Sequence, residues 1–201
     1  ENKERMRIMN LQNIPVEKLV HHPKNPRKDI GDITELSDSI KAKGILQNLT
    51  VVPAGDEYYV VIGNRRMEAA KAAGIKTLPC VIAEMDEKEQ METMLLENIQ
   101  RVDLTVKEQA DSFQLMMDLG LTVEELSEKT GFAKSTIYHR LNIAKLDGDV
   151  LEQKQVSMKQ LIELEKIKSV AKRNEILANY GDSPSFSYQV RYAAEEEKAE
   201  E

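Results

Sequence analysis

The chain has 201 residues, of which 28 are basic and 35 acidic, for a formal charge of −7. Hydrophobic residues make up 41% and charged residues 31%, which excludes wholesale disorder and fits one large folded domain or two small ones. No apolar run is long enough to cross a bilayer, and the single cysteine, Cys80, excludes an internal disulfide. We therefore expect a cytoplasmic protein with no membrane partner.

Residues 1–85 predict a mixed α+β module. The elements expected in order are an edge strand within 1–20, a loop over 21–28, a helix from 32 to 44, a hairpin of strands at 49–53 and 58–62, a helix from 63 to 73 and a strand at 78–82. Asp32 and Glu35 have the spacing of a capping box. Ile33, Leu36 and Ile40 recur at helical spacing, so we expect them to share one apolar face.

From residue 86 onward every predicted element is a helix. Three helix starts pair a capping residue with a glutamate three positions later: Asp86 with Glu89, Thr105 with Glu108, and Thr122 with Glu125. Later helices are expected at 147–155, 157–166, 169–179 and 186–195. The helix at 105–119 is expected to bury a stripe formed by Val106, Ala110, Phe113 and Met117. We predict a first domain over 1–104, a helical domain over 105–195 and an acidic linker or tail at 196–201.

Residues 121–141 have the pattern of a helix-turn-helix, with Gly131 at the tight turn. Four basic residues and no acidic one lie between Lys129 and Leu146. The side chains expected to contact phosphates and base edges are Lys134, Ser135, Thr136, Tyr138, His139, Arg140 and Lys145. Arg140 is expected to face solvent. The alternative interpretation is a plain helical hairpin whose polar face is merely solvated.

Three further segments have chemistry that suits a phosphate, a metal ion or a base. Gly63-Asn64-Arg65-Arg66 places two guanidiniums beside the N–H groups of a helix start, which suits phosphate. In the segment 97–101, Arg101 can bind phosphate and Glu97 or Asn98 can bind Mg²⁺, or Glu97 and Arg101 can form an ordinary i,i+4 salt bridge. Residues 44–47 can hydrogen-bond a base edge through their backbone, or can form an ordinary helix-to-strand connection.

Taken in this order and spacing, the motifs resemble the ParB family of bacterial chromosome and plasmid partition proteins. The resemblance covers about residues 8–195 and rests on Asn25-Pro26-Arg27-Lys28, LSDSIKAKGILQ at 36–47, YVVIGNRRMEAA at 59–70, the segment 97–101 and the helix-turn-helix. It implies an α+β, ParB/sulfiredoxin-like module that binds CTP, followed by an all-α helix-turn-helix module that binds DNA. Two positions depart from the family pattern, where Asn64 replaces glutamate and Asn48 replaces proline.

The resemblance also assigns roles within the CTP site. It implies that the cytosine contacts Gly44, Ile45, Leu46 and Gln47, and that the phosphates and Mg²⁺ lie among Gly63, Asn64, Arg65, Arg66, Glu97, Asn98 and Arg101. Glu97 and Asn98 are the implied metal ligands, and Glu97 is the implied catalytic residue for slow hydrolysis of CTP.

The same resemblance implies a homodimer that binds a palindromic, parS-type site in double-stranded DNA, closes as a CTP-loaded clamp and slides onto flanking DNA. A Walker-type ATPase is the implied partner, and the implied location is the bacterial nucleoid. The family's C-terminal dimerisation domain has no counterpart before Glu201. Two alternatives stay open. One is a ParB-like transcriptional repressor or nucleoid-occlusion factor without productive nucleotide switching. The other is an enzyme of the sulfiredoxin-like fold, which would need a cysteine in the loop 63–66.

Overall fold

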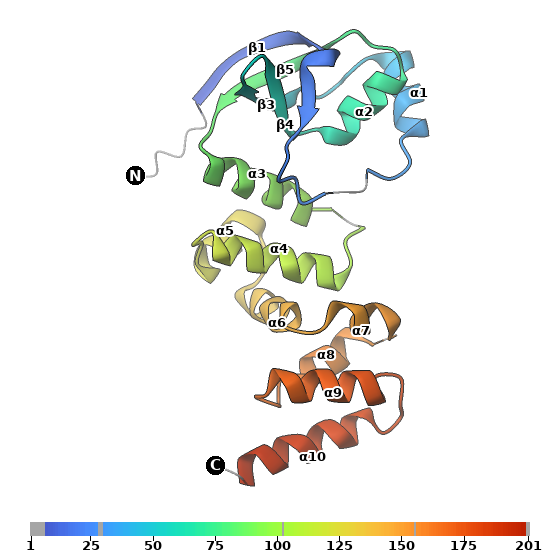
Figure 1. Ribbon diagram of the computed structural model, residues 1–201, viewed down its shortest axis with the longest axis vertical. Coiled ribbons are helices and arrows are strands. Elements are labelled where there is room, and N and C mark those ends of the chain that lie inside the picture. The colour runs from blue at the N-terminus through green and yellow to red at the C-terminus, as the bar shows by residue number, and fades with distance from the viewer. Residues whose placement is uncertain (1–6, 28–29, 102, 155, 200–201) are drawn as a thin grey trace. The chain divides into compact units, whose positions relative to one another are not determined.

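The computed structural model describes residues 7–27, 30–101, 103–154 and 156–199 (Figure 1). Lys28 of the Asn-Pro-Arg-Lys motif and the last two glutamates of the predicted acidic tail lie outside the described residues. The chain divides into two compact units, residues 1–100 and 101–201, where the sequence predicts a first domain over 1–104. Among the described residues the first unit holds all of the strands, and the second is helical.

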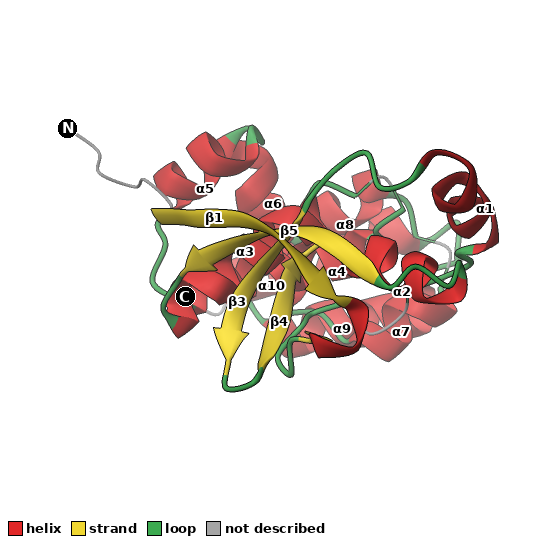
Figure 2. Cartoon of the chain, turned by 90° about the horizontal axis from the view of Figure 1, so that it is seen from above, coloured by secondary structure: helices red, strands yellow, loops and turns green. Residues whose placement is uncertain are grey.

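A twisted sheet forms the centre of the first unit, with its described strands in the order β1-β5-β3-β4-β2 (Figure 2). The strands are β1 Arg7–Pro15, β2 Leu19–His21, β3 Leu49–Ala54, β4 Glu57–Ile62 and β5 Thr77–Glu84. β1 pairs antiparallel with β5, and β3 antiparallel with β4, while β3 with β5 and β2 with β4 are parallel pairs. The predicted edge strand, hairpin and third strand are confirmed. The sequence does not predict β2, because three residues carry too little periodicity to distinguish a strand from a loop.

Helices cover both faces of this sheet. They are α1 Thr34–Lys43 and α2 Asn64–Ala72, which pack against each other, and α3 Glu87–Ile99, which packs on β4. Successive strand residues point to opposite faces, so Val51 joins the main core with Met67 of α2, while Val52 packs with Met94 of α3. A short 3-10 helix, η1 Val16–Lys18, joins β1 to β2.

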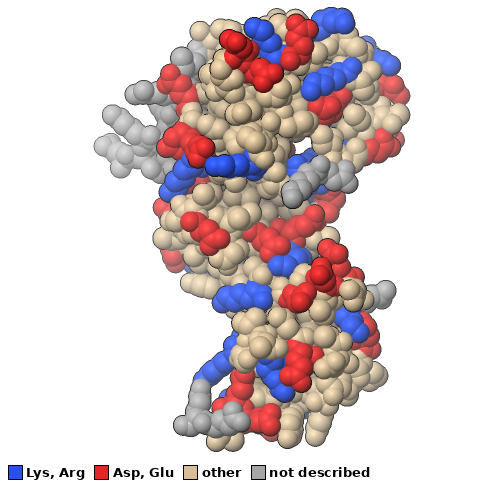
Figure 3. All heavy atoms as spheres, in the orientation of Figure 1, with Lys and Arg blue, Asp and Glu red and all other residues tan. Residues whose placement is uncertain are grey.

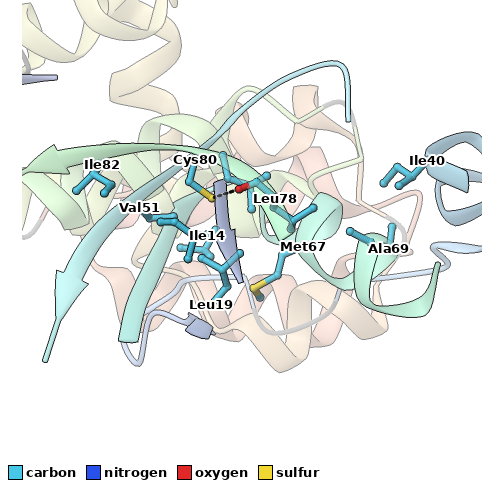
Figure 4. Close-up of a cluster of buried hydrophobic side chains, with 12 residues drawn as sticks. Ile14, Leu19, Ile40, Val51, Met67, Ala69, Leu78, Cys80 and Ile82 are labelled. Atoms are coloured by element: carbon cyan, nitrogen blue, oxygen red, sulfur yellow. Dashed lines mark hydrogen bonds between the residues drawn. The ribbon is translucent and has the colours of Figure 1, made fainter. Parts of the chain in front are cut away.

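The main core encloses the single cysteine (Figure 4). The Cys80 side chain is fully buried, and its thiol donates to the carbonyl of Leu78 at 3.4 Å. Burial raises the pKa of the Cys80 thiol to about 11, because the thiolate would be a charge without water around it. This thiol is therefore unreactive in the folded unit.

The start of α1 differs from the prediction. The helix begins at Thr34, and no side chain caps it. Asp32 Oδ1 instead accepts hydrogen bonds from the hydroxyl and the backbone N–H of Thr34, at 2.7 and 2.9 Å, and these bonds lower the pKa of the Asp32 carboxyl. An aspartate that bonds two residues ahead forms a local turn, and here this turn replaces the predicted capping box with Glu35. The predicted apolar face of α1 is confirmed.

The second unit is built from short helices. They are α4 Val106–Asp118, α5 Val123–Thr130, α6 Lys134–Ala144, α7 Gly148–Gln153, α8 Met158–Leu164, α9 Val170–Tyr180 and α10 Phe186–Ala199. Helices α5 and α6, with Gly131 between them at φ +78°, form the predicted helix-turn-helix. The predicted capping boxes form at Asp86, Thr105 and Thr122, and another forms at Ser157.

The buried stripe of α4 differs from the prediction at its last member. Ala110, Phe113 and Met116 are fully buried, whereas Met117 is only partly buried. Phe113 packs edge-to-face against Phe132, with ring centroids 5.6 Å apart. The sequence offers two adjacent methionines at helical spacing from Phe113, and the packing around that ring selects Met116.

The acidic stretch after residue 195 is helical as far as Ala199, rather than a tail. Alanine and glutamate are strong helix formers, so the local sequence supports the extension. Glu197 also accepts hydrogen bonds from the backbone N–H groups of Lys168 and Ser169, at 2.7 and 3.0 Å, where α9 begins. These two bonds lower the pKa of the Glu197 carboxyl and attach the end of α10 to α9.

Candidate functional site

A pocket of about 190 Å³ lies in the first unit, at the start of α2. Its walls come from the loop before α1, from α1, from the start of α2 and from α3: Asn25, Arg27, Leu36, Gly63, Asn64, Arg65, Arg66 and Glu97. Arginine is the commonest residue type in this lining, and only one carboxylate opposes the arginines. The lining is therefore suited to an anion.

Gly63 gives the pocket its backbone wall. It has φ +106°, a backbone conformation that residues with a Cβ disfavour. No side chain caps the start of α2, which follows it. A Cβ at this position would lie 3.0 Å from Cγ of Leu49 and 3.3 Å from Cζ of Arg66. The first N–H groups of a helix lack intrahelical acceptors and carry partial positive charge. This end of α2 therefore adds backbone donors to the basic lining.

Arg66 connects the pocket to the segment that leads into β3. Its Nη1 donates to the carbonyls of Gln47 and Asn48, at 2.7 and 2.8 Å. Among the residues that the structure describes, its Nε and Nη2 have no hydrogen-bond partner, so these donors remain for a ligand. Burial lowers the pKa of the Arg66 guanidinium, and the carboxylate of Glu97 opposes that change. Arg66 still carries its charge at neutral pH, and it carries it in a partly dehydrated position.

Arg65 and Arg27 hold the loop before α1. Arg65 donates to the carbonyls of Ile30 and Asp32, at 2.9 and 2.7 Å, and Arg27 donates to the carbonyl of Ile30 at 3.2 Å. Both arginines therefore have a structural role in addition to lining the pocket. A phosphate entering the pocket would compete with these carbonyls for the same N–H donors.

Asn64 is turned toward β2. Its Oδ1 lies 2.8 Å from Nδ1 of His21, and its Nδ2 donates to the carbonyl of Val60 at 3.3 Å. Nε2 of His21 lies 3.0 Å from Oε1 of Glu68. An amide carries no charge and does not act as a base at neutral pH, so position 64 lacks the carboxylate that the ParB pattern has there.

The segment 97–101 is not a single cluster. Glu97 is exposed and lines the pocket, whereas Asn98 is buried and is not part of the lining. Adjacent helix residues point about 100° apart, so a helix cannot present both to one small pocket equally. Arg101 belongs to the second unit, beyond the end of α3 at Ile99, and its guanidinium pairs with Asp103 at 2.6 Å.

Residues 44–47 lie outside the pocket lining. Gly44 ends α1 with φ +73°, and Ile45 packs against the main core. Leu46 is 81% exposed, and the Gln47 side chain is also exposed. The connection of this segment to the pocket is the hydrogen bond from Arg66 to the carbonyl of Gln47.

Asn25, Arg27 and Leu36 line the pocket although sequence reasoning did not select them as site residues. Asn25 and Arg27 stand in a motif that carries the family resemblance, so a signal for them was present. Leu36 recurs at the spacing of a core residue, and periodicity does not distinguish a core position from a pocket wall.

The predicted DNA-contacting residues on and after α6 fall into two groups. Lys134, Ser135, Tyr138 and Lys145 are exposed, and Thr136, His139 and Arg140 are partly buried. Lys134 is the first residue of α6, where helices that enter the major groove contact base edges. The exposed group therefore forms the accessible face of this helix.

Arg140 does not face solvent as predicted. Its Nε donates to Oε1 of Gln109 on α4 at 2.5 Å, and its Nη1 lies 2.9 Å from the sulfur of Met158 on α8. Burial lowers the pKa of this guanidinium. Arg140 lies three residues after Ile137 and one before Leu141, so it borders the buried face of α6. Helix α8 covers this border, and the sequence around Arg140 does not predict that contact.

On the face drawn in Figure 3, Lys and Arg side chains are interspersed with Asp and Glu, with no single large basic patch. None of the described helices is long and apolar enough to cross a membrane. No group of three or more His, Cys, Asp or Glu side chains converges among the described residues.

Known proteins resemble both units. Residues 1–99 match the family model of the ParB N-terminal domain. The chain is 39% identical over 141 residues to the chromosome-partitioning protein Spo0J of Thermus thermophilus, which covers 69% of this chain and 52% of that protein. The chain spans about half the length of the curated relatives it matches.

Two solved structures come from the C-terminally truncated chromosome-partitioning protein ParB of Caulobacter crescentus. The structure complexed to the centromeric parS site is 26% identical, has a TM-score of 0.69, and covers 92% of this chain and 99% of its own. The structure complexed with CTP-gamma-S is 29% identical, has a TM-score of 0.44, and covers 90% and 99% of the two chains. The first of these alignments extends the likeness from the N-terminal domain through the helical unit.

Proposed function

The chain belongs to the ParB family, and on that premise we propose that it is a CTP-dependent, site-specific DNA clamp of chromosome or plasmid partition. The observation that carries the nucleotide half of the proposal is the pocket at the start of α2, with Arg27, Arg65 and Arg66 in its lining. The helix-turn-helix carries the DNA half. The Caulobacter relative, which aligns with 92% of this chain, is complexed to parS DNA, and this supports the same class of ligand here.

In this proposal the pocket takes the phosphates of CTP. A ligand cleft for a whole drug-sized molecule measures roughly 300–1,000 Å³, and this one is about 190 Å³. The triphosphate therefore fits inside, against the start of α2 and the guanidinium of Arg66, and the cytosine lies along the exposed segment 44–47. Arg66 holds the carbonyl of Gln47, so the same side chain touches the phosphate region and positions the backbone that would contact the base.

Mg²⁺ would accompany the triphosphate, and Glu97 is the residue that fits it. Mg²⁺ in proteins is held by one or two carboxylates together with substrate phosphates, and Glu97 is the carboxylate in the pocket lining. Asn98, which the resemblance also implies as a ligand, is buried outside the lining and would need the end of α3 to rearrange. When bound, the ion would neutralise charge on the phosphate oxygens.

Slow hydrolysis of CTP is also part of this function, although the amide of Asn64 cannot serve as a base. Glu97 is the remaining carboxylate that could orient water, and Asn64→Glu should raise phosphate release. The observation at Asn64 also favours the second candidate, a ParB-like repressor or nucleoid-occlusion factor that binds nucleotide without turnover. Absence of phosphate release from both the wild-type chain and Asn64→Glu would favour that candidate.

Calorimetric titration with CTP, ATP, GTP and UTP, each with and without Mg²⁺, tests the nucleotide site. We expect CTP to bind most tightly, Arg66→Ala to weaken binding strongly and Glu97→Gln to weaken the Mg²⁺-dependent part. Lys71→Ala is the matched control, because Lys71 lies at the other end of α2 and pairs with Glu68. Equal affinities for the four nucleotides would remove the cytosine preference from the proposal.

A homodimer on a palindromic site and a Walker-type partition ATPase complete the proposal. Family membership supports both. Light scattering of the chain on a selected palindromic duplex should give a mass that corresponds to two chains, and a half-site duplex should bind one. A single chain on the full palindrome would contradict the dimer.

A further inference from the structure

The first cation of α6 is already paired within the helix-turn-helix. Lys134 Nζ lies 2.7 Å from Oε1 of Glu124, the second residue of α5, so this ion pair bridges the two helices across the Gly131 turn. Both side chains are exposed. Their hydrogen bond raises the pKa of the Lys134 ammonium and lowers the pKa of the Glu124 carboxyl.

A second side chain of α6 also lies against a carboxylate. Nδ1 of His139 lies 3.0 Å from both carboxylate oxygens of Glu165, which follows α8. Two side chains of the candidate recognition helix are thus held by carboxylates from neighbouring segments of the same unit. The local sequence hides this arrangement, because no acidic residue occurs between Lys129 and Leu146.

The pairing matters because phosphate binding and base recognition use a lysine differently. A phosphate contact needs a free cation, is independent of sequence, and steepens the salt dependence of binding. A base contact needs the ammonium at a fixed place near the start of the recognition helix. A carboxylate paired with Lys134 weakens the contact that the ammonium can make with a DNA phosphate. The same pairing restricts the position of the ammonium, as contact with a base edge requires.

We propose that Glu124 is a specificity-determining residue, which holds Lys134 for contact with a base edge and suppresses its binding to arbitrary DNA phosphates. The inference rests on the proposed DNA-binding function of α6. It predicts that Glu124 weakens binding to non-specific DNA while leaving the specific complex nearly unchanged.

Simple repulsion between Glu124 and DNA would also weaken binding, and it must be separated from the pairing. Glu128 on α5 also contributes to the electrostatic environment of Lys134, so removal of one charge could act at a distance. A double-mutant cycle separates the two causes, because pairing requires Lys134 whereas repulsion does not. Glu152→Gln is the matched control, since Glu152 is an exposed glutamate on α7 of the same unit.

The experiment uses the whole chain and two duplexes. One duplex is selected from a random pool by binding to the wild-type chain, and the other is a scrambled sequence of the same composition. Binding of the wild-type chain, Glu124→Gln, Lys134→Gln, the double variant and Glu152→Gln is measured over a range of salt concentrations. Circular dichroism verifies that each variant keeps its helical content.

We expect Glu124→Gln to bind the scrambled duplex roughly two- to fivefold more tightly, the range that corresponds to loss of an exposed ion pair. Its salt slope on that duplex should steepen by up to about 0.9, the value for one added phosphate contact. Affinity for the selected duplex should change less, so the ratio of the affinity for the selected duplex to that for the scrambled duplex should fall. In the Lys134→Gln background the Glu124 substitution should have no effect.

Two results would overturn the inference and leave DNA binding intact. One is unchanged binding of the scrambled duplex by Glu124→Gln, and the other is equal tightening with and without Lys134, which indicates repulsion alone. A wild-type chain that binds neither duplex would instead overturn the proposed DNA-binding function, and the inference with it.

Discussion

Gly63→Ala should damage the pocket in two separable ways. A left-handed φ costs a residue with a Cβ about 1–2 kcal/mol, and Gly63 has φ +106°. The new methyl would also lie 3.0 Å from Cγ of Leu49, which is fully buried, and 3.3 Å from Cζ of Arg66. Overpacking of this kind typically adds about 1–3 kcal/mol, so the first unit should lose about 2–5 kcal/mol of stability. Arg66 must move, and phosphate binding should weaken with it.

Gly74→Ala is the matched control for backbone strain. Gly74 follows the other end of α2 with φ +75°, and a Cβ there would meet nothing within 4 Å. This variant should therefore lose about 1–2 kcal/mol from the left-handed φ alone. Its nucleotide affinity should match that of the wild-type chain, because Gly74 does not line the pocket.

Cys80 provides the assay for the stability of this unit. It is the single cysteine of the chain and is fully buried in the core of the first unit, so a thiol reagent labels it only when that unit opens. When closing is faster than labelling, the labelling rate follows the open population, and each 1.4 kcal/mol raises it about tenfold. We expect about a five- to thirtyfold increase for Gly74→Ala and more than about thirtyfold for Gly63→Ala.

The nucleotide titration then separates strain from displacement of Arg66. Gly63→Ala should lose affinity for CTP while Gly74→Ala keeps it. Equal labelling rates for the two variants would refute the close approach at Gly63. Unchanged affinity of Gly63→Ala for CTP would show that Arg66 keeps its position in the pocket when residue 63 carries a Cβ.

Three further predictions concern the second unit. Arg140→Ala should lower the free energy of unfolding of this unit by about 1–2 kcal/mol, because side-chain hydrogen bonds and packing are lost. Tyr138→Ala should leave that free energy unchanged and weaken DNA binding, because Tyr138 is exposed. The reverse result would contradict the burial of Arg140. Ile137→Asp should abolish cooperative unfolding of the helical unit in circular dichroism, because it places an unpaired carboxylate at a fully buried position, and a native-like melt would be inconsistent with that burial. The pKa of the Glu197 carboxyl is lowered in the folded chain, so its capping bonds are fully present above the ordinary value of 4.5 and are lost as pH falls through the lower folded pKa. The protection factor of the Ser169 amide hydrogen, its exchange relative to the intrinsic rate at the same pH, should fall over that range, and Glu197→Gln should remove this dependence; identical pH profiles of protection in the two chains would exclude the cap.

Patterns confined to a few neighbouring residues were sufficient to predict much of the fold. The capping boxes at Asp86, Thr105 and Thr122 depend only on a side chain and the backbone three residues away, and all three form as predicted. The hairpin and the helix-turn-helix are also local, because a tight turn joins elements of matching periodicity. The order of the motifs was sufficient to identify the family.

The candidate site was only partly predictable for the same reason. The segment 63–66 forms a wall of the pocket, since its glycine and arginines act together with the start of one helix. Asn98 and the segment 44–47 stand outside the lining, and Asn25 and Leu36 stand within it. Which of these residues meet is decided by how α1, α3 and the loop before α1 are placed around α2.

Long-range packing decided the remaining features. Arg140 is partly buried because α4 and α8 supply Gln109 and Met158, which lie 31 and 18 residues away in the chain. Lys134 is paired because α5 turns back and presents Glu124 to it. Sequence by itself determined the charges, the capping boxes and most of the helices and strands, since these depend mainly on neighbouring residues. The fold alone determined which charges are dehydrated, paired or available to a ligand, because solvent access and ion pairing depend on groups brought together from distant parts of the chain.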